Sequence, residues 1–179
     1  MCDENYKGYG LVPYSDGNFP DEFLIYLFER MQEEGTASVV FFEGKITTSE
    51  KWLEMIKCHG MHLFVGFFDG ELAGLCWLER SQEKWAQFNF CFFKNSWGHK
   101  KSIAWGKWAA NELLNLKDEH GYLMDMLVGI TPSRNKLALR LAKLCDWKES
   151  GRLPFGVFNG QTGKSEEAVI STFIRGDCL

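Results

Sequence analysis

Residues 85–114 read WAQFNFCFFKNSWGHKKSIAWGKWAANELL, a strand pattern that runs into a helix pattern through a short basic segment. The first part alternates, with Ala86, Phe88, Phe90 and Phe92 on one side and Trp85, Gln87, Asn89, Cys91 and Phe93 on the other. This period of two predicts a strand with one fully apolar face over Trp85–Lys94. Small and apolar residues at helical spacing, without proline, predict a helix from about Ser102 to near Gly121.

The segment that joins this strand to this helix, residues 95–102, carries Lys100 and Lys101. The first amides of a helix lack an intrahelical partner, and the helix dipole favours negative charge there. The segment therefore predicts an anion site, which we interpret as a site for the pyrophosphate of a nucleotide-derived cofactor. Taken alone, the two lysines fit a solvated loop and Ser102 fits a plain helix cap; the strand–loop–helix setting favours the anion site.

Length and charge restrict the class of protein. The 179 residues fit one domain spanning 1–179. A formal charge of -4 gives no global basic field, which argues against nucleic acid as a partner. No apolar run is long enough to span a bilayer, and the acidic start lacks the apolar core of a signal peptide. We therefore expect a cytoplasmic protein without a membrane partner.

The cysteines and histidines give no metal-ligand pattern. No Cys-x-x-Cys pair occurs among Cys2, Cys58, Cys76, Cys91, Cys145 and Cys178, and most of them lie in apolar runs. A free cysteine in such a run packs as a small hydrophobe. We expect reduced thiols and no metal site. Cys91 could instead act as a nucleophile together with His99. We prefer the interpretation that Cys91 packs as a small apolar side chain.

The remaining elements follow from periodicity and turn signals. Before residue 85, the sequence predicts an edge strand over Tyr9–Tyr14, a helix over Asp21–Glu34, a short strand or extended connection over Ser38–Phe42, and a helix from the Thr47–Glu50 capping box to about Lys57. Asp69-Gly70 predicts a hairpin of strands His62–Phe68 and Glu71–Arg80. After the central helix come a strand over Tyr122–Ile130, a helix over Arg134–Cys145 and a strand pair, Gly156–Asn159 with Ala168–Ile174. This order predicts an α+β layered domain.

That order resembles the GCN5-related N-acetyltransferase superfamily over nearly the whole chain, most firmly over residues 62–150. In that family, Gln/Arg-x-x-Gly-x-Gly/Ala follows the third strand of the meander, and its backbone amides wrap the pyrophosphate of acetyl-CoA. The matching stretch here is His99-Lys100-Lys101-Ser102-Ile103-Ala104. Ala104 fits the last position, His99 replaces Gln or Arg, and Ser102 replaces the first glycine. The resemblance implies a mixed, mostly antiparallel central sheet flanked by helices.

The family's second motif, Asn-x-x-Ala followed four residues later by Tyr, lies in the later helix. Here Asn135 and Ala138 match, and Ala142 stands where the family has the tyrosine. In the family that hydroxyl often protonates the leaving thiolate of CoA. A thiolate with a pKa of roughly 8.5 can leave without full protonation.

The resemblance also implies where the chemistry would occur. Family members use backbone amides near the end of the motif-bearing strand to polarise the thioester carbonyl and to pair with the pantetheine. By position these groups lie at Phe93, Lys94 and Asn95, and they would act as an oxyanion hole does. The acceptor amine must lose a proton before attack. Glu79 and Asp125 are the nearest carboxylates by topology, and each also fits a structural or surface role.

Together these features predict an acetyl-CoA-dependent N-acetyltransferase that transfers the acetyl group directly to an amine in a ternary complex. The acceptor would be a small-molecule or peptide amine, held near the loop Val39–Lys45, which carries Phe41, Phe42 and Glu43. The alternative is a binding or interaction module that kept the fold and lost turnover, an idea favoured by Ser102 and Ala142. We also consider a homodimer, because the aromatic C-terminal strands could pair between two copies of the chain.

Overall fold

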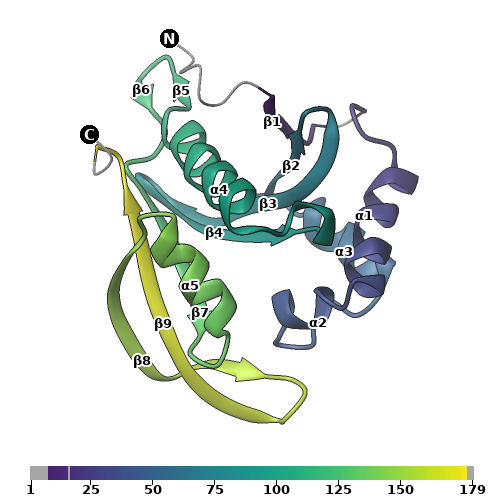
Figure 1. Ribbon diagram of the computed structural model, residues 1–179, viewed down its shortest axis with the longest axis vertical. Coiled ribbons are helices and arrows are strands. Elements are labelled where there is room, and N and C mark those ends of the chain that lie inside the picture. The colour runs from purple at the N-terminus through teal and green to yellow at the C-terminus, as the bar shows by residue number, and fades with distance from the viewer. Residues whose placement is uncertain (1–7, 16, 177–179) are drawn as a thin grey trace.

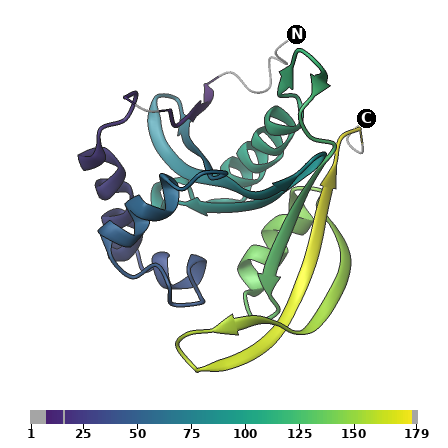
Figure 2. The same cartoon turned by 180° about the vertical axis from the view of Figure 1, so that it is seen from behind.

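One seven-stranded sheet separates two layers of helices (Figures 1 and 2). The computed structural model describes residues 8–15 and 17–176, apart from the side chains of Arg80, Ser81 and His99. The predictions made above for Cys2, Cys178 and the start of the chain concern residues outside those ranges. The strands, in their order across the sheet, are β1 (Tyr9–Pro13), β2 (His62–Phe68), β3 (Glu71–Gln82), β4 (Trp85–Phe92), β7 (Met126–Pro132), β9 (Lys164–Ile174) and β8 (Lys148–Asn159).

Neighbouring strands of this sheet are antiparallel except β4 and β7, which are parallel. A separate small hairpin consists of β5 (Lys117–Asp118) and β6 (Gly121–Tyr122). The predicted mixed, mostly antiparallel sheet of an α+β fold is therefore confirmed.

The helices cover both faces of the sheet. They are α1 (Asp21–Glu33), α2 (Ala37–Val40), α3 (Ser49–Ile56), α4 (His99–Leu114) and α5 (Lys136–Leu144), and a short 3₁₀ turn, η2 (Lys94–Ser96), follows β4. Helices α4 and α5 lie on the face toward the viewer in Figure 1, whereas α1, α2 and α3 lie on the opposite side of the sheet. Two hydrophobic cores result, one on each face.

Strand β4 contributes to both cores because its side chains alternate in direction. Phe88 and Phe92 pack in the core under α4, whereas Cys91 and Phe93 pack in the core under α1 and α3. The period-two prediction for this strand is confirmed. Its predicted polar side is also covered, since Gln87 is only 8% exposed.

The predicted β2–β3 hairpin is also confirmed. Asp69 and Gly70 link the two strands with φ angles of 50° and 80°. Two successive positive φ angles match the right-handed twist of the strands, and Asp-Gly tolerates them better than most pairs. The hairpin fixes the register that brings β3 beside β4.

Several segments differ from the prediction, and one of them is β9, which starts at Lys164 rather than at Ala168. Ser38–Phe42 was predicted as a strand or extended connection, but the chain forms α2 over Ala37–Val40, because one helical turn buries Ala37 against α1 and α3. Helix α4 begins at His99 and ends at Leu114, not near Gly121, because residues 117–122 form the small β5–β6 hairpin. Strand β7 therefore starts at Met126, not Tyr122.

Strand β8 begins at Lys148, well before the predicted start at Gly156. Pro154 and its neighbouring glycines suggested a break, but β8 is an edge strand and its register shifts between Leu153 and Val157. Edge strands and bulges tolerate Pro and Gly because one side of the strand needs no ladder hydrogen bonds.

Candidate active site

The sheet splits open between β4 and β7. Their parallel pairing is limited to Trp85–Met126, Ala86–Leu127 and Gln87–Val128. Beyond these pairs, β4 remains paired with β3 alone as far as Phe92, and β7 with β9 alone as far as Pro132. The two strands diverge in Figure 1, with α5 lying over the opening. The sheet thus provides a wedge with two facing strand edges.

Main-chain groups on these edges point into the wedge. The Phe93 amide donates to the Ala73 carbonyl (3.0 Å), so Phe93 faces β3. Because main-chain direction alternates along an antiparallel strand, Phe90 and Phe92 face the opposite way, toward β7. On β7, the Asp125 carbonyl accepts from the Arg175 amide and therefore faces β9. Because the main-chain direction alternates along the strand, the main-chain groups of Ile130 face the other way, toward β4. Within the described chain, these positions lie beyond the β4–β7 pairing, so Phe90 and Ile130 have no strand partner on this side.

A cavity of about 490 Å³ occupies the wedge. It is bounded by both strands, by the start of α4, by α5 and by the segment from Glu34 to Phe42. Most of its lining is aliphatic or aromatic. The charged side chains that line it among the described residues are Glu34 and Arg140. A cavity of this size, apolar with a few polar groups, fits an elongated organic ligand.

The N-terminus of α4 opens at one end of this cavity. Gly98 precedes the helix with φ 148° and ψ 132°, and the first turn carries no acidic residue. The Ser102 amide and hydroxyl both donate to the Gly98 carbonyl, at 3.3 and 3.0 Å. Because α4 starts earlier than predicted, the amides without a helical acceptor are those of residues 99–101 rather than those of Ser102, Ile103 and Ala104.

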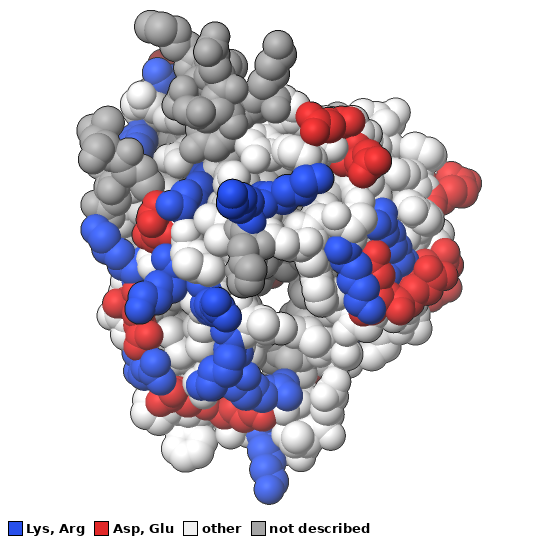
Figure 3. Space-filling model, in the orientation of Figure 1, with Lys and Arg blue, Asp and Glu red and all other residues white. Residues whose placement is uncertain are grey.

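Of the predicted diphosphate-binding residues, Ser102 and Ile103 line the cavity and Ala104 does not. The side chain of Lys100 is exposed. Lys101 lies with its ammonium 4.6 Å from the ring centroid of Phe68, on the other side of α4. The side chain of His99 lies outside the described atoms. Figure 3 shows basic side chains gathered around a hollow on the face formed by α4 and α5.

Two of the three main-chain amides predicted to polarise the thioester, those of Phe93 and Lys94, donate to other groups. Phe93 donates to β3, and the Lys94 amide donates to Glu34 Oε2 (2.7 Å). The Asn95 side chain accepts from Arg30 (2.8 Å) and donates to the Leu72 carbonyl (3.1 Å). By strand register, the main chain of Phe90 and the amide of Phe92 face the wedge, whereas the Phe92 carbonyl already accepts from Trp97 Nε1 (3.0 Å).

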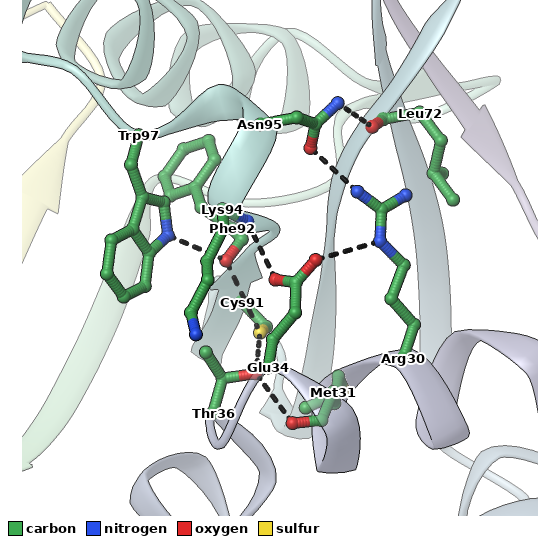
Figure 4. A network of polar contacts seen from close by, with 10 residues as sticks. All are labelled: Arg30, Met31, Glu34, Thr36, Leu72, Cys91, Phe92, Lys94, Asn95 and Trp97. Carbon is green, nitrogen blue, oxygen red and sulfur yellow. Dashed lines mark hydrogen bonds and ion pairs between the residues drawn. The ribbon is translucent and has the colours of Figure 1, made fainter.

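Glu34, which sequence reasoning missed, joins the end of α1 to the end of β4 (Figure 4). Its other oxygen accepts from Arg30 Nε at 2.9 Å, and the Glu34 side chain is 15% exposed. Arg30 also lies over the ring of Phe93, 4.2 Å from the centroid. Glu34 is therefore a carboxylate held in place by two hydrogen bonds at the cavity wall. No sequence signal marks it, because it falls in the last turn of an ordinary amphipathic helix.

Thr36 and Cys91 form the wall beside Glu34. The Cys91 thiol donates to the Thr36 hydroxyl (3.4 Å), which in turn donates to the Met31 carbonyl (3.1 Å). Burial raises the pKa of Cys91 to about 11. A thiol that is protonated at neutral pH is a poor nucleophile, so the packing interpretation of Cys91 fits this site better than the nucleophile interpretation.

Helix α5 carries the second predicted motif to the cavity. Asn135 precedes the helix, and its side-chain oxygen accepts from the Ala138 amide (3.2 Å), as a helix cap does. Asn135, Ala138 and Ala142 all line the cavity. The position at which the family has a tyrosine therefore faces the wedge, and here it is a methyl group.

Neither predicted base lines the cavity. Glu79 accepts from Gln87 (2.7 Å) and Asn89 (3.3 Å) on the face under α1 and α3. Asp125 lies at the closed end of the β4–β7 pairing and forms an ion pair with Arg175. Both carboxylates are thus occupied in structural contacts. Among the described residues, no group of three or more His, Cys, Asp or Glu could hold a metal ion.

Of the three residues named in the predicted acceptor loop, one lines the cavity. Phe42 lines the cavity, whereas Phe41 stacks on Trp77 (5.6 Å between centroids) and Glu43 pairs with Lys45 (2.7 Å). The Gly160 amide donates to the Phe42 carbonyl (2.9 Å). The β8–β9 hairpin is thereby tied to the acceptor loop.

In the part of the chain that the structure describes, no helix has the length and apolar character needed to cross a bilayer.

Comparison with known proteins identifies solved structures that have a similar fold. No model of a known family matches the chain, and no curated protein sequence matches it. Solved structures do match. Ribosomal-protein-S5-alanine acetyltransferase from Vibrio fischeri has a TM-score of 0.68 and 10% identity, covering 96% of this chain and 95% of that chain. Spermidine N-acetyltransferase from Vibrio cholerae, in complex with CoA and spermine, has a TM-score of 0.67 and 16% identity, covering 94% and 96%. This chain has the fold of the GCN5-related N-acetyltransferases.

Proposed function

We propose that this protein is an N-acetyltransferase that transfers the acetyl group of acetyl-CoA directly to an amine in a ternary complex. The observation that carries the proposal is the wedge between β4 and β7, which opens in front of the first turn of α4. A diphosphate at that turn could accept from the amides of residues 99–101, and a pantetheine between the strands could pair with the main chain of Phe90 and the amide of Phe92. The likeness of fold to acetyltransferases supports the same function.

The coenzyme would be held mainly by the main chain. The amides of residues 99–101 would bind the diphosphate, with Lys100 and Lys101 adding positive charge and Asn135 a polar contact. The pantetheine would lie as an added strand beside Phe90 and Phe92. Backbone binding explains how the site could tolerate Ser102 in place of the family's glycine.

The transfer itself needs little from side chains. The neutral amine nitrogen attacks the thioester carbonyl carbon and the C–N bond forms; the nitrogen then loses a proton to water, the C–S bond breaks and CoA leaves as a thiolate. An amide facing the wedge, that of Phe90 or Phe92, would stabilise the developing oxyanion. With Ala142 in place of a tyrosine, the thiolate would leave unprotonated and take its proton from water.

Glu34 is the group best placed to bind the acceptor. It is the one carboxylate among the described residues that line the cavity, and each of its oxygens has accepted one hydrogen bond. A carboxylate oxygen has a further lone pair, which can accept from an ammonium group. The amine would shed its proton to water before attack.

Calorimetric titration with acetyl-CoA tests the cofactor, and CoA release over a panel of amines tests turnover. Replacing Lys100 and Lys101 together by Glu should weaken coenzyme binding about tenfold. The matched control is Lys51→Glu with Lys164→Glu, two exposed lysines away from α4. Thiol detection of CoA must subtract Cys58, which is exposed and free.

The second candidate is a coenzyme-binding module without turnover, an idea favoured by the missing tyrosine at Ala142. Binding of acetyl-CoA with no CoA release across primary amines and peptide N-termini would support the module. Absence of binding at millimolar coenzyme would contradict both candidates.

A further inference from the structure

The cavity between β4 and β7 has walls on both faces of the sheet. On one face it is bounded by α4 and α5, and on the other by the segment 34–42, which contains the C-cap of α1 and helix α2. The first turn of α4, where the diphosphate would bind, belongs to the former face. A second substrate that approaches from the opposite face therefore meets the wall formed by residues 34–42, which we call the α2 wall.

Apolar side chains make up most of the α2 wall. Val39, Val40 and Phe42 line the cavity there. Ala37, on the same helical turn, is buried in the core with α1 and α3, and this contact orients α2 so that Val39 stays 50% exposed beside the cavity. Exposed apolar groups that surround a cavity mark a surface that binds apolar groups. The α2 wall is therefore suited to a hydrocarbon group.

The α2 wall carries one charged side chain among the described residues, that of Glu34. Arg140, the other charged residue of the lining, belongs to α5 on the opposite face. The neutral polar side chains on the side of Glu34 are already hydrogen-bonded, because the Thr36 hydroxyl donates to a main-chain carbonyl (3.1 Å) and the Asn89 amide donates to a carboxylate (3.3 Å). One carboxylate balances one ammonium group, and a second ammonium here would lose water without gaining a charged partner.

We propose that the acceptor is a small primary amine with a single ammonium group and an apolar alkyl or aryl substituent, rather than a polyamine. The inference rests on the proposed function. The ammonium group would lie at Glu34, and the substituent would pack against Val39 and Phe42. The single carboxylate sets the number of charges that the acceptor can carry, and the apolar side chains of the α2 wall select the substituent.

Initial rates of CoA release at saturating acetyl-CoA test the acceptor class. Butylamine and hexylamine are each compared with the α,ω-diamine of the same chain length, which differs only in its second amino group. We expect kcat/KM for hexylamine to exceed that for its diamine by about tenfold or more, because the far end of the diamine would carry a charge into an apolar wall. Two further buried methylenes should also raise kcat/KM for hexylamine about tenfold above that for butylamine.

A variant of the α2 wall tests which residues set this preference. Val39→Glu adds a second carboxylate, so it should lower kcat/KM for hexylamine and raise it for the diamine, which reduces the preference about tenfold. The Val39 side chain is half exposed, so the substitution leaves the core intact. The matched control is Leu153→Glu, because Leu153 is 47% exposed on β8 and does not line the cavity. It should keep the wild-type preference.

A wild-type protein that acetylates the diamine as well as hexylamine, or peptide N-termini but neither amine, would overturn the acceptor class and leave the proposed function standing. Equal changes of preference in Val39→Glu and Leu153→Glu would overturn the role of the α2 wall. If acetyl-CoA does not bind, or binds without CoA release to any amine or peptide, the proposed function fails and the acceptor class fails with it. The wild-type series alone decides the acceptor class, so that result does not depend on a variant being folded.

Discussion

At the scale of single residues, Glu34 has the most consequential contacts in the cavity wall. Its two oxygens accept from Arg30 and from the Lys94 amide, which joins α1 to the end of β4. An amide side chain has only one oxygen, so in Glu34→Gln an NH₂ group would face one of these two donors. We expect a loss of about 1–3 kcal/mol in the free energy of unfolding.

Urea unfolding measures this loss, with Glu33→Gln as the control, because Glu33 is the exposed neighbour on the same helix. If both variants are as stable as the wild type, the Glu34 contacts do not hold the two elements together.

The buried thiols predict a dependence of stability on pH. Burial raises the pKa of Cys91 to about 11, above the value near 8.5 of an unfolded thiol. The folded state therefore holds this proton more tightly. Its contribution is fully present below about pH 8.5 and is lost as the pH rises toward 11. We expect Cys91 to account for about 1–2 kcal/mol of the stability lost by pH 10.

Comparing urea midpoints at pH 7 and pH 10 checks this expectation. The fall should be smaller in Cys91→Ala than in the wild type, and unchanged in Cys58→Ala, whose thiol is exposed. Parallel falls in all three proteins would show that the thiol does not titrate as described.

At the scale of elements, the seating of α4 on the sheet depends on a glycine in β2. A Cβ at Gly66 would lie 2.2 Å from the Trp105 ring, and Trp105 is only 3% exposed with its ring held edge-on by Phe92. The ring is buried, so it can move aside only by losing its packing against Phe92. We expect Gly66→Ala to destabilise the protein by about 1–3 kcal/mol through overpacking.

Thermal unfolding measures the effect. Gly151→Ala is the matched control, because a Cβ there meets no atom within 4 Å and Gly151 does not have a positive φ. Similar unfolding temperatures for Gly66→Ala and the wild type would mean that α4 is not seated through this contact.

The elements also show how far sequence reasoning reaches. Alternation in Trp85–Phe92 and the Asp69-Gly70 turn specified the meander, because period and turn chemistry are local properties. Residues 38–42 and the start of β8 were missed because tertiary packing of Ala37 and the bulge near Pro154 override local propensity. The site was placed only approximately: Asn135 and Ser102 line the cavity, whereas Glu79 does not.

At the scale of the whole molecule, the position of the acceptor loop depends on a contact between segments far apart in the chain. The Gly160 amide donates to Phe42, and a Cβ at Gly160 would lie 2.4 Å from the Glu43 carbonyl oxygen. Because the obstructing atom is main chain, it cannot rotate away. In Gly160→Ala we expect the hairpin tip to separate from the acceptor loop.

Hydrogen exchange measured by mass spectrometry should then be faster in peptides that cover residues 36–44, with α4 unchanged. Thr162→Ala, an exposed change in the same turn, should leave exchange in that loop as in the wild type. Unchanged exchange in Gly160→Ala would show that the hairpin does not hold the acceptor loop in place.

The central claim concerns where a coenzyme binds, and a crystal structure of the protein with acetyl-CoA tests it most directly. We expect the diphosphate within hydrogen-bond distance of the amides of residues 99–101 and the pantetheine beside Phe90 and Phe92, between β4 and β7. A coenzyme bound outside the wedge, or a wedge that stays empty at millimolar acetyl-CoA, would contradict the account.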